Sequence, residues 1–242
     1  MVYILKLAIN DFRNIIRDRF LVYASIIMPL LVIVISRIIL HWIAPTIGDT
    51  IPLAKNYSII FMLFVTMIPI IYGFITAFLI LDERDEHLLT VLRVMPISRN
   101  AYLVYRMFFM SVFSFIVLLI FPPLSGLVDG TQFSYIEYIP IAVLFTLLTP
   151  FSGLLVSSFA NNKVQAFAIF KISGTVYLLP LFAFLLSDNL KYIFSPIPNF
   201  WTFMTLKEVI YTGMNDYLHL GIGFVYHIAL IAVLFYIFNK KY

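Results

Sequence analysis

The densest group of ionisable side chains in this sequence directly follows a long apolar stretch. It gathers four of the chain's 12 acids and two basic side chains within six positions: Asp82, Glu83, Arg84, Asp85, Glu86 and His87. Large apolar residues recur at spacings of seven, four and three: Leu81, Leu88, Leu92 and Met95. This periodicity predicts a short helix with one apolar face. Its acids would lie in the first turns and Arg93 in the last, which suits the helix dipole.

Two interpretations of this helix stay open. Its charges could simply keep a connection in water. Solvated loops, however, seldom carry a stripe of large apolar residues, so we favour a docking helix for a cytoplasmic partner, with leucine anchors and charges that set the register. The candidate docking residues are Asp82, Glu83, Arg84, Asp85, Glu86, His87, Leu88, Leu89, Leu92 and Arg93. Pro96 ends the predicted helix, and Ser98 is the expected N-cap of the next one.

Two other ionisable residues interrupt apolar stretches. Lys171 lies roughly 10 Å along its predicted helix at 1.5 Å per residue. Its simplest interpretation is a lysine that extends its ammonium to the inner membrane interface, and the alternative is a role in a polar pathway or a subunit interface. His227 lies near the middle of the last apolar stretch. A hydrogen bond to a neighbouring helix is the simpler interpretation, and proton or substrate handling is the alternative.

The sequence lacks the common catalytic and metal-binding motifs. It contains no cysteine, and its four histidines are scattered without an H-E-x-x-H pair. No G-x-S-x-G nucleophile motif and no G-x-x-x-x-G-K-[ST] nucleotide-binding loop occurs. We therefore expect no catalytic residue, no metal site and no cofactor on this chain, and any ATP hydrolysis must come from a partner.

The composition identifies the environment of these residues. Of the 242 residues, 62% are hydrophobic and only 12% charged, whereas soluble domains carry roughly 25% charged residues. A chain of this length cannot bury that much apolar surface in water. Six stretches have the length of a membrane-spanning helix: about 20–40, 57–81, 107–128, 138–160, 164–186 and 217–238. The expected fold is an all-α integral membrane protein with one transmembrane domain, 1–242.

Two segments outside the spans have helical patterns of their own. Over residues 1–19 and into the first span, apolar residues from Leu5 to Phe20 recur at spacings of three and four. They predict an amphipathic elbow helix on the cytoplasmic surface, whose characteristic residues are Phe12, Arg13, Arg17 and Arg19. The segment Ser187–Asp216 is aromatic but broken by prolines. It predicts a half-helix in the outer interface before the sixth span.

The basic residues predict the orientation. With the N-terminus inside, 11 lysines and arginines lie on the inner face and four on the outer face. The positive-inside rule then places both termini in the cytoplasm of a multi-pass plasma-membrane protein. No cleavable signal pattern precedes the first span. The net charge of +4 is therefore explained by membrane topology, and no nucleic-acid partner is expected.

A family resemblance supports the docking interpretation. The residues from Glu83 to Leu92, followed by Met95-Pro96-Ile97-Ser98-Arg99, resemble the signature "E-R-E/D-x-G/H-T/L-L-x-x-L … x-P-x-S/T-R" of ABC-2 type transporter permeases. The N-terminal Asn14-Ile15-Ile16-Arg17-Asp18-Arg19 also looks like that family. Small hydrophobic drug exporters look nearest. One departure is His87, where many members carry glycine.

The resemblance implies an exporter permease. Such proteins have six spans, form homo- or heterodimers and bind two cytoplasmic ATPase subunits, which hold ATP and Mg. The helix after the second span is their coupling helix. The cargo is a drug, lipid, polysaccharide or peptide, and its path would follow the first, second and fifth spans at the dimer interface. The alternatives are an ATP-independent secondary transporter or channel, disfavoured because no acid lies inside a span, and an intramembrane enzyme, disfavoured by the missing motifs.

Overall fold

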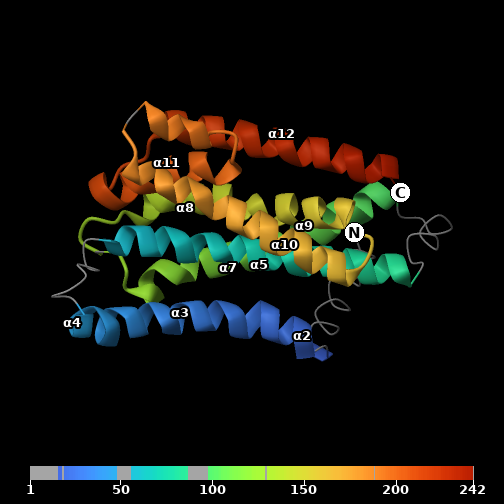
Figure 1. Cartoon of the computed structure of the whole chain (residues 1–242), viewed down its shortest axis with the longest axis horizontal. Coiled ribbons are helices and arrows are strands. Elements are labelled where there is room, and N and C mark those ends of the chain that lie inside the picture. Colours follow the sequence, from blue (N-terminus) through green and yellow to red (C-terminus); the bar gives the residue numbers. More distant parts are fainter. Residues whose placement is uncertain are drawn as a thin grey trace.

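The computed structural model describes residues 16–17, 19–47, 56–86, 98–128, 130–187 and 189–241. All regular elements in these ranges are helical. Six of them are long and apolar enough to cross a membrane: Tyr23–Thr46, Tyr57–Asp85, Arg99–Ser125, Tyr135–Phe159, Lys163–Leu185 and Tyr217–Lys241. The predicted all-helical membrane fold with six spans is confirmed. The helices lie side by side along the long axis, with the first and sixth spans at opposite edges of the view (Figure 1).

The first span is a continuous helix with two wider turns. Its segments are α2 (Arg19–Val22), the π-helical η1 (Tyr23–Ile27), α3 (Met28–Ile38), the π-helical η2 (Ile39–Ile43) and α4 (Ala44–Ile47). Only 17% of its apolar stretch is buried within the chain. Most of the predicted elbow helix, including Phe12 and Arg13, lies outside the described residues. Arg17 and Arg19 are exposed at the start of this span.

The second span, α5 (Tyr57–Asp85), is the centre of the bundle, with 78% of its apolar stretch buried. It packs against α7 (Arg99–Ser125), α9 (Leu148–Phe159) and α10 (Lys163–Leu178). Its closest crossing is with α9, where Gly73 meets Gly153. A Cβ atom on Gly73 would lie 2.6 Å from the Ser152 Cβ and 2.8 Å from the Thr149 carbonyl oxygen. Only glycine permits this approach.

Prolines divide the fourth and fifth spans. Pro150 has no N–H for the carbonyl of Thr146, and the fourth span consequently consists of α8 (Tyr135–Thr146) and α9, which meet at Leu147. Pro180 likewise cannot bond to the carbonyl of Val176. The fifth span tightens there from α10 into the 3-10 helix η5 (Leu179–Leu185).

Tyrosine hydroxyls satisfy carbonyls that other prolines leave without a helical donor. Pro122 lies inside α7 and cannot donate to the carbonyl of Leu118. The hydroxyl of Tyr138 donates to that carbonyl at 3.1 Å. In the first span, the hydroxyl of Tyr72 donates to the carbonyl of Ser25 at 2.7 Å, four residues before Pro29. These hydrogen bonds attach α8 to α7 and α5 to the first span.

The segment before the last span folds into the bundle. It contains the 3-10 helix η6 (Leu190–Phe194) and α11 (Pro198–Thr212), followed by α12 (Tyr217–Lys241). The predicted half-helix is therefore present as α11. It does not lie on the bundle surface, because nine of its 15 residues are buried against α8, α12 and η5. Figure 1 shows α11 beside α8 and α12.

Candidate functional site

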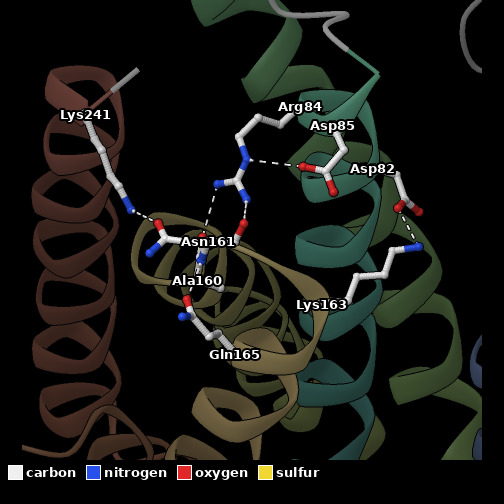
Figure 2. Close-up of polar contacts among 8 residues, drawn as sticks. All are labelled: Asp82, Arg84, Asp85, Ala160, Asn161, Lys163, Gln165 and Lys241. Atoms are coloured by element: carbon white, nitrogen blue, oxygen red, sulfur yellow. Dashed lines mark hydrogen bonds and ion pairs between the residues drawn. The ribbon is translucent and has the colours of Figure 1, made fainter.

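Five helix ends meet at one end of the bundle, and polar side chains join them. They are the end of α5, the start of α7, the end of α9, the start of α10 and the end of α12. We call this region the polar end; its residues are Asp82–Glu86, Ser98–Arg106, Ser158–Gln165 and Asn239–Lys241. Figure 2 shows eight of its side chains, which converge on the turn between α9 and α10.

A buried ion pair joins α5 to α7. The carboxylate of Glu83 contacts the guanidinium of Arg106, and both residues are buried, at 9% and 4% exposure. Arg106 also donates to the Tyr102 hydroxyl at 3.0 Å. These residues lie on either side of the connection between the second and third spans. The pair therefore holds the two ends of that connection together.

Arg84 and Asp82 join α5 to the turn between α9 and α10. Arg84 donates to the carbonyls of Ala160 at 3.1 Å and Asn161 at 2.7 Å. A cation is favourable there because the last carbonyls of α9 carry partial negative charge. Asp82 lies 2.5 Å from the ammonium nitrogen of Lys163. Figure 2 shows the two contacts on opposite sides of α5.

The same turn also holds the end of α12. Lys241 donates to the carbonyl of Ser158 at 2.9 Å and to the Asn161 side chain at 3.1 Å. Asn162 caps α10 by accepting from the N–H of Gln165, whose side chain accepts in return from the N–H of Asn161. This reciprocal cap fixes the turn from both sides.

The structure corrects the predicted position of the acids. Asp82, Glu83 and Asp85 lie in the last turn of α5, and Glu86 is its C-cap. They were expected in the first turns of a separate helix. Acids are unfavourable at a helix C-terminus, but Lys163 and Arg106 neutralise two of them here.

Only the first part of the predicted docking helix, up to Glu86, lies within the described residues. Glu83 is buried with Arg106, so it offers no docking surface. Asp85 and Glu86 are exposed. The remaining predicted docking residues lie outside the described part of the chain: His87, Leu88, Leu89, Leu92 and Arg93. Ser98 accepts a hydrogen bond from the N–H of Ala101 at 3.2 Å, which confirms it as the N-cap of α7.

A cavity of about 430 Å³ lies between the first, second and fifth spans. These are the spans along which the family resemblance places the cargo path. Met28, Met67 and Phe170 contribute to its apolar walls, and Lys171 is the only charged residue among the described residues that line it. The structure thus assigns Lys171 to a cavity wall.

His227 is fully buried in α12 and does not line this cavity. Its Nδ1 lies 2.8 Å from the carbonyl oxygen of Gly223, one turn earlier in the same helix. The predicted hydrogen bond to a neighbouring helix is not found among the described residues. Its Nε2 has no hydrogen-bond partner in that part of the chain.

Several contacts of the polar end escaped the sequence prediction. Arg106, Lys163 and Lys241 were recognised only as basic residues on the inner face. Their partners Glu83, Asp82 and Asn161 are 23, 81 and 80 residues away, so no local periodicity connects them. One of these contacts could have been predicted from the sequence. Arg106 lies at the edge of an apolar run, where a charge requires a partner.

A bundle of six helices that are long and apolar enough to cross a membrane defines the class of multi-pass membrane proteins. The chain belongs to the family described as fluoroquinolones export permease protein Rv2686c-like, whose model matches residues 11–235. This confirms the resemblance to export permeases and is consistent with an ABC-2 type permease.

Two curated relatives from Mycobacterium tuberculosis have the same similarity to this chain. They are the fluoroquinolones export permease proteins MT2760, of strain CDC 1551 / Oshkosh, and Rv2686c, of strain ATCC 25618 / H37Rv. Each is 29% identical over 238 residues, which covers 96% of this chain and 92% of the relative. No solved structure matches the chain.

Proposed function

We propose that this chain is the membrane subunit of an ATP-driven exporter of amphipathic drug-like compounds, assembled with a separate cytoplasmic ATPase and a second permease. The observation that carries this proposal is the polar end. There, the connection after the second span is held at both ends by the buried Glu83–Arg106 pair. Exposed acids at Asp85 and Glu86 begin that connection.

The arrangement supports a direct route for movement. A partner that displaces the connection between α5 and α7 displaces both helices, because the ion pair joins them. α5 also lines the cavity through Met67, Ile70 and Ile71. Force applied at the polar end would therefore change the cavity wall. ATP and Mg belong to the partner, which supplies the energy, while this chain supplies the path.

The cargo class rests on two observations. A cavity of about 430 Å³ falls within the roughly 300–1,000 Å³ typical of drug-sized ligands. The two curated relatives are named for fluoroquinolone export. We infer that the chain exports fluoroquinolone-like compounds across the plasma membrane, with the polar end and both termini on the cytoplasmic side.

The test is partner capture followed by charge reversal. The tagged chain is purified from native membranes, and the co-purified proteins are identified by mass spectrometry. We expect an ATPase with a nucleotide-binding loop. Asp85→Lys with Glu86→Lys should reduce its recovery by about tenfold, because reversed charges repel the complementary surface.

Glu208→Lys is the matched control. Glu208 lies on α11, away from the polar end, and its reversal should leave recovery of the ATPase unchanged. Equal recovery with the double reversal would contradict docking at Asp85 and Glu86. Cargo uptake by inverted vesicles without ATP, driven by an ion gradient alone, would instead establish a secondary transporter.

A further inference from the structure

Lys171 differs from the other basic residues near the polar end. Lys163 pairs with Asp82, and Arg84 and Lys241 donate to carbonyls at the end of α9. Lys171 is exposed, and none of the carboxylates in the described ranges forms an ion pair with it. It lies eight residues after Lys163, or about 12 Å along α10 at 1.5 Å per residue. An unpaired ammonium at this depth is costly unless a ligand offsets its lost hydration or the side chain extends to the inner interface.

The cavity around Lys171 is otherwise apolar. Thr175 also lines it, but its hydroxyl is already bonded to the backbone carbonyl of Lys171 at 2.9 Å. The aromatic rings of Phe170 and Phe182 contribute to the walls. Gly174 adds space, because nothing lies within 4 Å of where its Cβ would be. The cavity therefore presents one positive charge among flat and flexible apolar groups.

We propose that Lys171 recognises the carboxylate of an aromatic amphipathic cargo. This inference rests on the proposed export function and specifies its substrate chemistry. The ammonium and the carboxylate would offset each other's loss of hydration, while Phe170 and Phe182 contact the ring system. Fluoroquinolones have this chemistry: a fused aromatic ring that carries a carboxylate.

A lipid phosphate is the competing source of negative charge. Side chains on a helix lean toward its N-terminus, which for α10 is the polar end, where the inner headgroups are expected. The two sources differ in a measurable way. A cargo carboxylate makes the role of Lys171 depend on the cargo, whereas a headgroup makes it depend on the lipid.

The experiment uses the complete exporter, with its ATPase, in liposomes. ATP-dependent transport is measured for a fluoroquinolone and for its methyl ester, which lacks the negative charge. The readout is the ratio of acid transport to ester transport. Lys171→Met should lower this ratio by about tenfold or more, as expected for loss of a charged hydrogen bond. Lys171→Arg should restore most of the ratio, and Lys191→Met, on η6 and outside the polar end, should leave it at the wild-type value.

Each other outcome has a definite meaning. If the wild-type protein transports neither compound, the proposed export function fails, independently of Lys171. An unchanged ratio in Lys171→Met, or equal loss of both compounds, overturns carboxylate recognition. An effect of Lys171→Met that appears with anionic lipids and disappears in pure phosphatidylcholine assigns the residue to a headgroup. Lys171→Gln serves as a second variant if Lys171→Met does not fold.

Discussion

Glu83 and Arg106 show how a single pair of side chains can set the geometry of a connection. Each is nearly inaccessible to solvent, and each would be unfavourable there alone. A buried pair adds little net stability over an apolar pair, but it is costly to break. Its main effect is positional, because it fixes where α5 ends relative to where α7 begins.

We predict that Glu83→Ala destabilises the protein by about 3–5 kcal/mol, because it leaves the Arg106 charge buried without its carboxylate. The double variant Glu83→Leu with Arg106→Leu should recover most of that loss. Thermal unfolding in detergent provides the measurement. If the double variant is as unstable as Glu83→Ala alone, the unpaired charge of Arg106 is not the cause of the destabilisation.

At the scale of elements, the crossing of α5 and α9 is the tightest contact described. Gly153 faces Thr76, whose Cγ2 would lie 3.0 Å from an added Cβ. Gly73 meets the Ser152 Cβ and the Thr149 carbonyl oxygen at still shorter distances. Neither atom can move without its helix, so the two helices are held at a fixed separation.

Gly73→Ala should therefore destabilise the bundle by roughly 1–3 kcal/mol through overpacking, despite the higher helix propensity of alanine. Gly221→Ala in α12 is the matched control, because nothing lies within 4 Å of its Cβ position. Melting temperatures of the two variants in the same detergent test the difference. If the melting temperature of Gly73→Ala equals or exceeds that of Gly221→Ala, the close approach of α5 and α9 at Gly73 is contradicted.

The sequence predicted elements better than contacts. All six spans were recognisable, because a spanning helix is recorded locally as a length of apolar residues. Ser98 was likewise recognisable, because a cap acts within a single turn. The length of the apolar run, however, placed the end of the second span too early. The apolar run stops at Asp82, but the helix continues to Asp85 because Arg106 and Lys163, distant in sequence, neutralise two of its acids.

The sequence predicted which spans surround the cavity but not which residues line it. The resemblance pointed to the first, second and fifth spans, and Lys171 was singled out by its charge. Neither could show that the residue lines a cavity wall, since this depends on how α10 is rotated against α5. The burial of α11 was also missed, because prolines and aromatic residues in that segment fit an interfacial helix equally well.

At the scale of the whole molecule, the asymmetry of positive charge predicts which end faces the cytoplasm. The chain has no cysteine, so single cysteines can report the orientation without background. Lys191→Cys, on η6, should react with a membrane-impermeant maleimide in intact cells. Asp85→Cys should react only after the membrane is opened. The reverse pattern would invert the proposed topology.

The six spans are buried within the chain to different extents, and this difference bears on which compounds the protein can accept. α5 forms one wall of the cavity and is buried over most of its length, whereas the first and fifth spans are each only 17% buried within the chain. One wall is therefore formed by the most buried helix of the bundle, and the other two by helices that pack against the chain over a small part of their surface. In the proposed exporter, we expect these two lightly packed walls to adjust to cargo of different widths, while Lys171 sets the orientation of the cargo.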